Sequence, residues 1–329
     1  MNRIFTTAAL SVAMFLVGSS ANAGTILLSG WTIDIDAALG VAPGTYGTTG
    51  PINRLDFSGI AHTHLGDTNL NGLPDVGERF GIDGVVAATS FSPVSSNQTS
   101  VAGTFLNDAF EITGDFSTAA VVTSFDGANA SFTHLAPGSI VDGVAYDGLL
   151  RLFADNVVNA DTDLVTGLAP GSGFTDGQQV ATFRTLSGTG NINVASFDGN
   201  DDLFFELVGA KAGVLFDSNG TDLSTLIGSS LVTIAFTDSN FDLNPSGGNP
   251  LGEDASASWN APKAGVDLLT GIALSGFVET GFGSIGSAFA EENGSLRLQQ
   301  VPEPSTFAIW ATLMVGGVGL ARRKMKNRS

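Results

Sequence analysis

The chain has 329 residues, no cysteine and a strong acidic excess, with 32 acidic against 13 basic side chains. A net charge of −19 opposes direct binding to nucleic acid or other polyanions, because their phosphate groups would be repelled. The absence of cysteine excludes disulfides, thiolate metal ligands and thiol catalysis. Stability must therefore come from a hydrophobic core, from bound metal, or from both.

The first residues predict a secretory signal peptide. One positive charge at Arg3 precedes a short apolar run, and Ala21-Asn22-Ala23 then fits a small-x-small cleavage site. We expect cleavage between Ala23 and Gly24, so that residues 1–23 are removed on export and the mature chain begins at Gly24.

Residues 24–300 predict one all-β domain that carries seven basic and 31 acidic side chains. Short apolar or alternating segments are separated by Asp-Gly and Asn-Gly dipeptides, such as Asp142-Gly143, which suit tight hairpins. Many short strands with glycine-rich turns favour a sandwich or jelly-roll-like fold. The expected strand regions are 25–36, 60–65, 80–91, 110–125, 139–153, 179–197, 203–216, 230–236, 255–259, 266–277 and 294–299.

One segment between two expected strands, Asp67–Glu78, fits the calcium-loop pattern D-x-[DN]-x-[DN]-G-x5-E at every fixed position. Calcium prefers six to eight hard oxygen ligands, and Gly72 at the sixth position permits the sharp turn that such a loop needs. The expected ligands are the side chains of Asp67, Asn69, Asn71, Asp75 and Glu78 and the backbone carbonyl of Leu73.

The predicted flanks of this loop are strands rather than helices, so an EF-hand pair is excluded. The loop resembles the isolated calcium loops of thrombospondin type 3-like repeats, in which Leu-Pro-Asp follows the glycine, as Leu73-Pro74-Asp75 does here. Two of the three early ligands are asparagines, so we expect a Kd of roughly 10⁻⁵–10⁻³ M, as in extracellular modules. The alternative is a metal-free, Asx-rich surface turn.

Other candidate motifs are weaker. The acidic segments Asp198–Glu206 and Asp238–Asp242 lack the glycine of a calcium loop, which favours solvated acidic turns. His62 and His64 would share one face of a strand, but two ligands make an incomplete zinc site, and His134 is interpreted as structural. Gly281–Gly286 fits G-x-G-x-x-G without the strand and helix of a nucleotide site, which favours a β-turn.

The end of the chain predicts a membrane-associated tail over residues 301–329. Val301-Pro302-Glu303-Pro304 interrupts regular structure, and Ser305–Ala321 then carries no charge and would span about 25 Å as a helix. That length is at the lower limit for a bilayer core. A basic cluster that begins with Arg322 and Arg323 follows, which places the terminus on the cytoplasmic side.

The order of these three parts resembles the PEP-CTERM sorting signal of Gram-negative bacteria. The resemblance covers only the tail and implies removal of the tail by an exosortase after transient anchoring in the inner membrane. It also implies a cell-surface or secreted location, in bacteria that make exopolysaccharide. A plain C-terminal anchor is the alternative interpretation.

We therefore expect a non-enzymatic extracellular-matrix protein that supports biofilm or floc formation with exopolysaccharide and binds Ca²⁺. Asp67–Glu78 and Asp201–Leu207 are similar to segments of flocculation-associated PEP-CTERM proteins. Self-association of the mature chain is left open.

Two other functions are weighed against this one. A carbohydrate-binding module would stack sugars on exposed aromatic rings, for which the candidates are Trp31, Tyr46, Tyr146 and Trp259. A secreted glycan hydrolase would need two carboxylates at a set separation, and the chain has no nucleophile motif such as G-x-S-x-G.

Overall fold

The computed structural model describes residues 26–27, 30–69, 71, 73–94, 102–160, 173–193, 199–227, 231–242 and 287–301. Residues Leu27–Gln300 form one compact unit. Within the described residues, no helix is long and apolar enough to cross a membrane.

Several predicted features lie outside the described residues. They are the signal peptide with its Ala23/Gly24 cleavage site, the tail from Pro302 through Arg322 and Arg323, the strand regions 255–259 and 266–277, and the Gly281–Gly286 motif.

Ten strands form one sheet, in the order β1-β14-β13-β11-β10-β6-β5-β4-β3, with β9 pairing with both β10 and β5. The strands are β1 (Ile26–Leu27), β3 (Ile52–Gly66), β4 (Arg79–Pro93), β5 (Glu111–Phe125), β6 (Asn129–His134), β9 (Leu149–Asp155), β10 (Gln178–Asn193), β11 (Gly199–Ala210), β13 (Leu231–Asp242) and β14 (Ser287–Val301). Every strand pair with a described register is antiparallel.

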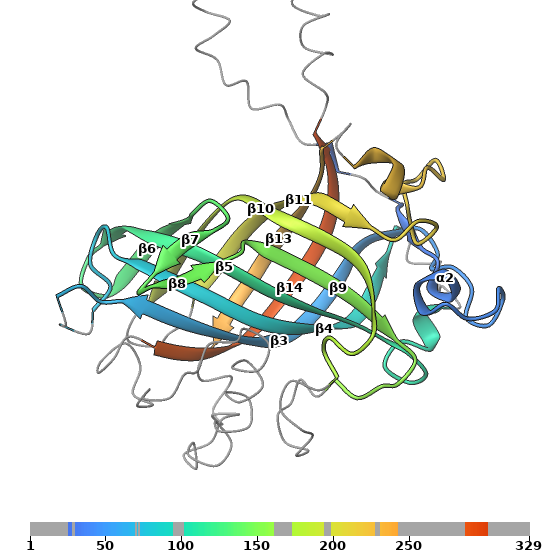
Figure 1. Cartoon of the computed structure of the whole chain (residues 1–329), viewed down its shortest axis with the longest axis horizontal. Helices are drawn as coiled ribbons and strands as arrows, with labels where there is room; N and C mark the ends of the chain where they lie inside the picture. The colour runs from blue at the N-terminus through green and yellow to red at the C-terminus, as the bar shows by residue number, and fades with distance from the viewer. Residues whose placement is uncertain are drawn as a thin grey trace, which may run out of the picture. The chain divides into compact units, whose positions relative to one another are not determined.

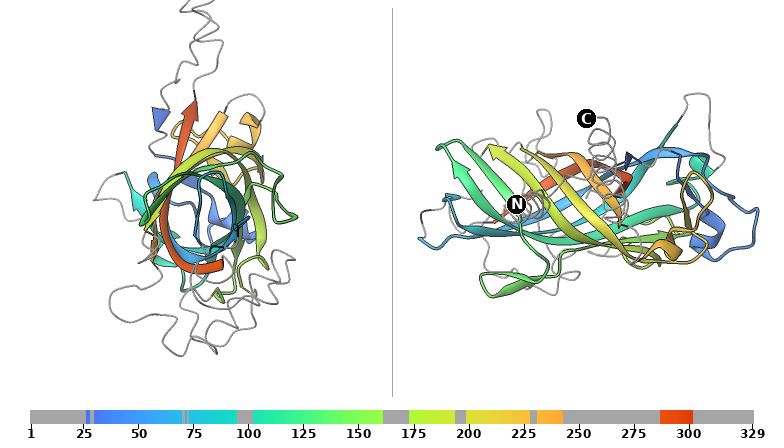
Figure 2. Two further views of the ribbon diagram at one scale, coloured as in Figure 1. Left: turned by 90° about the vertical axis from the view of Figure 1, so that its left-hand side faces the viewer. Right: turned by 90° about the horizontal axis from the view of Figure 1, so that it is seen from above.

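The sheet closes on itself, because β14 also pairs with β3, from Ser287↔His64 to Leu296↔Leu55. Figure 1 shows β14 beside β3, and Figure 2 shows the strands surrounding a common interior. Opposite walls of the sheet therefore face each other across one core, as the two layers of a sandwich do. The prediction of an all-β fold is confirmed, whereas the predicted terminal helix lies outside the described residues.

The core consists of side chains from all around this sheet. Strands such as β6 alternate between buried and more exposed positions, which is the period of two that places one row of side chains inside. The largest fully buried rings are those of Trp31, Phe110, Phe183 and Phe205. A chain without disulfides thus relies on aromatic burial, worth about 1.5–3 kcal/mol for each fully buried large side chain.

The predicted strand over 25–36 is wrong in its second half. After the short strand β2 (Thr32–Ile33) the chain turns into helix α2 (Ile35–Leu39). The Asp34 carboxylate accepts a hydrogen bond from the backbone N–H of Ala37 at 2.9 Å and so caps the helix. Gly40 ends α2 with a φ of 68°, a left-handed conformation that glycine adopts without strain.

The remaining elements are short. β12 (Leu215–Phe216) pairs with β2, and β7 (Ser139–Val141) pairs with β8 (Val144–Tyr146). The 3-10 turns are η1 (Ala102–Thr104) and η2 (Leu223–Leu226). Asp142 and Gly143 join β7 to β8 with φ values of 49° and 82°, which confirms the tight hairpin predicted for this dipeptide.

Candidate functional site

The Asp67–Glu78 segment connects β3 to β4, so both predicted flanking strands are present. Gly66 and Arg79 form the last pair of the two strands, and the loop spans the residues between them. The end of the loop is also tied to β5, because Val122 exchanges two backbone hydrogen bonds of 2.9 Å with Gly77 and Glu78. The sheet therefore fixes both ends of the candidate calcium loop.

The carboxylate of Glu78 joins the beginning and the end of this loop. Only 5% of Glu78 is exposed, and its Oε1 accepts hydrogen bonds from the backbone N–H (2.8 Å) and hydroxyl (2.9 Å) of Thr68. Its Oε2 accepts a hydrogen bond from the backbone N–H of Asp75 at 3.0 Å. A buried carboxylate thus lies at the position that closes a twelve-residue calcium loop.

The other predicted side-chain ligands bond to the loop's own polar groups. Asp67 Oδ1 accepts from the backbone N–H groups of Asn69 (3.2 Å) and Asn71 (3.3 Å). Asn71 Oδ1 accepts from the backbone N–H of Leu73 at 2.7 Å. The side-chain amides of Asn69 and Asn71 both donate to Asp75 Oδ2, at 2.6 and 2.7 Å. The five side-chain ligands are therefore brought together by the local fold.

The chemistry of these groups fits calcium. All five side chains offer oxygen, and three of them are carboxylates, which suits a hard cation of this size. Among the described residues, Asp75 and Glu78 form no salt bridge that would neutralise their charge. The side chain of Leu73 has no oxygen, so only its backbone carbonyl can serve the predicted role. Leu70 and Gly72 lie outside the described residues.

The described residues of the two weaker acidic segments lie in strands, so the prediction of acidic turns is wrong for them. Residues 200–206 belong to β11, and Asp238, Asn240 and Asp242 belong to β13. Alternation along β11 places Asp201 inside the protein with 1% exposure, while Glu206 forms an ion pair with Arg184. A strand holds successive side chains on opposite faces, so it cannot wrap them around one ion.

The buried carboxylate of Asp201 contacts His134, the histidine that the sequence predicts to be structural. His134 Nε2 lies 2.7 Å from Asp201 Oδ2, and His134 Nδ1 lies 3.1 Å from the hydroxyl of Thr118. Burial raises the pKa of Asp201, and the neighbouring His134 partly offsets this rise. All three residues are at least 92% buried, so a bulky substrate has no access to this Thr-His-Asp chain.

The second histidine of the possible zinc pair, His64, lies beside another carboxylate. Its Nε2 is 3.3 Å from Asp142 Oδ2, in the turn between β7 and β8. The side chain of His62 lies outside the described residues, so the zinc pair stays a prediction.

Among the aromatic residues proposed for sugar stacking, the three that the structure describes do not form an exposed platform. Trp31 is 1% exposed and Tyr146 is 3% exposed, so the prediction is wrong for both. Tyr46 is half-buried and packs edgewise on Phe105 and Phe110, with ring centroids 5.7 and 5.4 Å apart. Trp259 lies outside the described residues.

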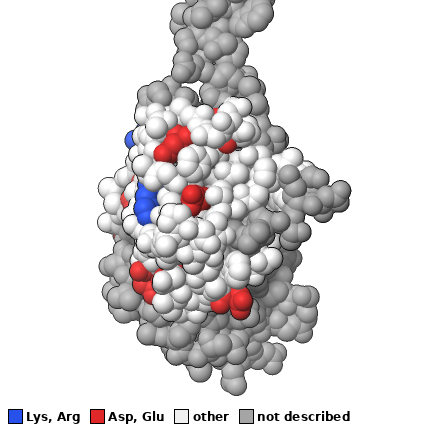
Figure 3. Space-filling view, turned by 90° about the vertical axis from the view of Figure 1, so that its right-hand side faces the viewer, with Lys and Arg blue, Asp and Glu red and all other residues white. Residues whose placement is uncertain are grey.

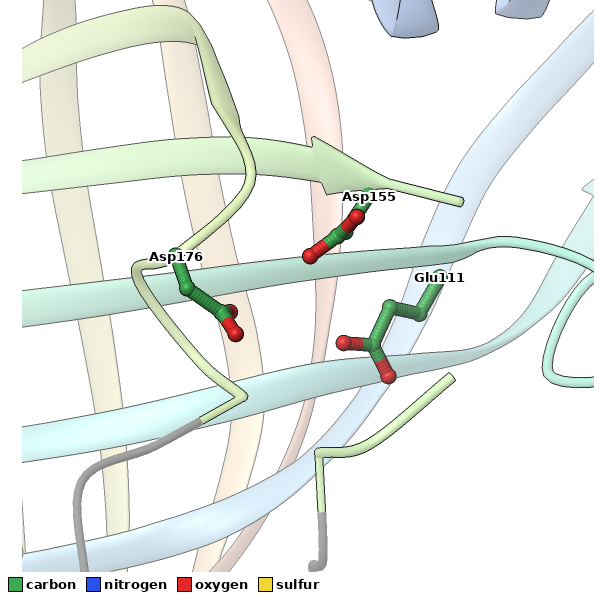
Figure 4. A group of neighbouring side chains, drawn as sticks. All are labelled: Glu111, Asp155 and Asp176. Carbon is green, nitrogen blue, oxygen red and sulfur yellow. The ribbon is translucent and has the colours of Figure 1, made fainter. Parts of the chain in front are cut away.

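The structure also brings together three carboxylates that sequence reasoning missed: Glu111, Asp155 and Asp176. One oxygen from each lies within 4.8 Å of the others, and Figure 4 shows the carboxyl groups turned toward a shared space. The pKa of Glu111 is raised to about 7, mainly because the group is buried. The two aspartates also raise this pKa, and hydrogen bonds from two backbone N–H groups lower it. Only strand pairing makes these residues neighbours, so no local motif could have revealed them.

Comparison with known proteins identifies the tail of the chain. The family model of the PEP-CTERM protein-sorting motif matches residues 300–326, which include Val301, Pro302, Glu303, Pro304, Arg322 and Arg323. No curated protein and no solved structure matches the chain. The motif implies export and processing by an exosortase during membrane transit in a Gram-negative bacterium. The chain therefore carries a PEP-CTERM protein-sorting motif, the recognition signal of an exosortase, over residues 300–326.

Proposed function

We propose that this exported protein is a structural component of the extracellular matrix that supports biofilm or floc formation with exopolysaccharide, and that Ca²⁺ bound by Asp67–Glu78 orders its β3–β4 loop. The calcium part of this proposal rests on one observation: the oxygen groups of the loop converge around the carboxylate of Glu78, which is only 5% exposed. The matrix half rests on the sorting motif, which directs the protein toward the cell exterior.

The charge of the protein supports a role for calcium in the matrix. Residues 24–300 carry 31 acidic and seven basic side chains, and Figure 3 shows separate acidic groups with few basic ones on one face. An acidic polysaccharide would be repelled by such a surface unless divalent cations screen or bridge the charges. Calcium would therefore act both within the loop and between protein and polymer.

We also propose that the protein is not an enzyme. Among the described residues, the arrangement closest to an activated nucleophile is Thr118, His134 and Asp201, whose side chains all lie inside the core. A nucleophile must reach the substrate's reacting atom, which this buried threonine does not.

Calcium should stabilise the purified chain of residues 24–301 through the loop. At a Ca²⁺ concentration a hundredfold above Kd, a single site adds about 2.7 kcal/mol to the free energy of unfolding, which raises Tm by several degrees. Glu78→Ala removes the closing carboxylate and should abolish the part of the gain that comes from this loop. Thermal melts of both proteins in EDTA and across a Ca²⁺ titration measure this difference.

Glu78→Ala also removes three hydrogen bonds, so it should lower Tm in EDTA. The decisive quantity is therefore the calcium-induced change in Tm rather than Tm itself. Asp108→Asn, which removes one exposed negative charge away from the loop, should respond to Ca²⁺ as the wild type does. An equal calcium response in Glu78→Ala and the wild type would refute the loop as a calcium site.

The matrix role predicts that deletion of the gene reduces floc size and settling. Complementation with the wild-type gene should restore both, whereas Glu78→Ala should restore them less well because its loop is not ordered by Ca²⁺. Settling rate and retained exopolysaccharide are measured in the same cultures. Unchanged settling and polysaccharide retention in the deletion strain would contradict the matrix role.

A further inference from the structure

Glu111 and Asp155 form a like-charged pair in the sheet. They lie directly opposite each other, at the first pair of the antiparallel β5–β9 register. Like charges in such a position destabilise a strand pair, because the side chains are only about 5 Å apart. Asp176, in the segment that leads into β10, adds a third carboxylate to the same space. A bound cation would offset the repulsion among these three carboxylates.

Two buried oxygens at this position have no hydrogen-bond partner. Glu111 is 1% exposed, and its Oε1 accepts no hydrogen bond, although its Oε2 accepts from the backbone N–H groups of Asn159 (3.1 Å) and Ala160 (2.9 Å). The side-chain Oδ1 of Asn159 is also buried and unpartnered, while its Nδ2 donates to Asp176 at 3.0 Å. Unpaired buried acceptors are rare, since each costs about 1–3 kcal/mol.

The backbone around the carboxylates is held closely in place. Thr113 donates its hydroxyl to the carbonyl of Phe174 at 2.7 Å, and the Phe174 ring is buried. Gly173 has a φ of 92°, and a Cβ there would lie 2.5 Å from the carbonyl oxygen of Asn159. The segment that carries Asp176 is therefore fixed against the one that carries Asn159, independently of any ligand.

We propose that Glu111, Asp155 and Asp176 bind a second Ca²⁺ ion. Three carboxylates are hard oxygen donors, which suit Ca²⁺. Calcium ligands lie at about 2.4 Å from the ion, so ligands on opposite sides of it are about 4.8 Å apart. The carboxylate oxygens lie within 4.8 Å of one another, which is the spacing of ligands around one calcium ion.

This site is independent of the Asp67–Glu78 loop. Glu111 begins β5, whereas the loop is tied to β5 at Val122. Eleven residues of strand separate these positions, about 36 Å at 3.3 Å per residue. An ion at the acidic cluster would link β5, the end of β9 and the start of β10, and would leave the β3–β4 loop unaffected.

The test is the calcium stoichiometry of the full-length chain, purified in mild detergent and titrated calorimetrically with Ca²⁺ at about 0.15 M salt to screen diffuse binding. We expect Glu111→Gln to bind one ion fewer than the wild type, and Asp176→Asn to bind at the same site at least roughly tenfold more weakly. Glu78→Ala should lose the other ion, so failure of one site does not mask the other. Asp108→Asn, three residues before Glu111, should bind as the wild type does.

A stability readout separates binding from folding. In EDTA, Glu111→Gln should be at least as stable as the wild type, because it removes a buried charge beside two other carboxylates. Addition of Ca²⁺ should then raise its Tm less than that of the wild type. Since Asp176 is exposed, Asp176→Asn should fold even where Glu111→Gln does not. Wild-type stoichiometry and affinity in Asp176→Asn, or in folded Glu111→Gln, would overturn the proposal.

Discussion

Asp83 shows how burial changes the behaviour of a single carboxyl group. It lies on β4 with 2% exposure. Its pKa is raised from 3.8 to about 7, mainly because the group is buried. The nearby charges of Asp147 and Asp115 also raise this pKa, and a hydrogen bond from Ser117 lowers it. The folded protein therefore binds this proton more tightly than the unfolded chain does.

Asp83→Asn should reduce the pH dependence of stability. Because the folded pKa is the higher one, the stability from protonated Asp83 is fully present below pH 4 and is lost as pH rises to about 7. The loss is up to about 1.4 kcal/mol per pH unit over that range. The variant keeps a neutral side chain, so its free energy of unfolding should fall less between pH 5 and 8 than that of the wild type.

Urea unfolding in EDTA at pH 5, 6, 7 and 8 measures this slope. Asp108→Asn removes an exposed carboxylate and should keep the wild-type slope, which controls for the general effect of net charge. Parallel curves for Asp83→Asn and the wild type would show that Asp83 is already ionised at pH 5 in the folded protein.

At the scale of single residues, sites formed within one short segment could be predicted, whereas contacts between distant segments could not. The candidate loop Asp67–Glu78 could be predicted because all its oxygen groups lie within twelve consecutive residues. His134 and Asp201, by contrast, are 67 positions apart and meet across β10, where Gly188 has no side chain and leaves room for the His134 ring. Glu111, Asp155 and Asp176 likewise come from separate segments. Charges that are close in space but not in sequence become visible only when strand pairing is known.

At the scale of elements, local signals located β4 and β5 over most of their length but found only part of β3 and β14. The expected regions 80–91 and 110–125 correspond to β4 and β5, since both contain apolar runs, Gly77 precedes the first and Asp126-Gly127 follows the second. β6 was missed because it has six residues and little apolar content beyond its alternation. Its start is set by Asp126, whose Oδ1 accepts from the backbone N–H groups of Ala128 and Asn129 at 2.9 and 2.7 Å.

The packing of the β7–β8 hairpin on the sheet depends on a residue that has no side chain. A Cβ at Gly81 on β4 would lie 1.7 Å from the ring of Tyr146, so only glycine leaves space for this ring. In the sequence, Gly81 is one of two glycines within a strand pattern, which indicates a close approach but not the partner. The partner is 65 residues away and could not be predicted.

At the scale of the whole molecule, closure of the sheet depends on its last strand. β14 pairs with β3 although more than 200 residues of chain separate them. The sequence predicted strands at both places but not their pairing, because register between distant strands is set by the complete core. Closure removes two exposed sheet edges, which matters for an exported protein that must not aggregate edge to edge.

The sorting tail begins where this closing strand ends, and a stop codon after Val301 should separate sorting from folding. β14 ends at Val301, while the family match runs from 300 to 326, so this truncation keeps β14 and removes most of the motif. The truncated protein should keep the wild-type Tm and calcium response, because the closed sheet is complete. It should fail to be processed by exosortase, which changes its distribution among periplasm, cell surface and medium; fractionation and immunoblotting measure this.

A stop after Gly286 is the matched control, since loss of β14 opens the sheet and should abolish cooperative unfolding. Surface levels equal to those of the wild type after the Val301 stop would contradict tail-dependent sorting. A lower Tm would instead show that residues beyond 301 support the fold.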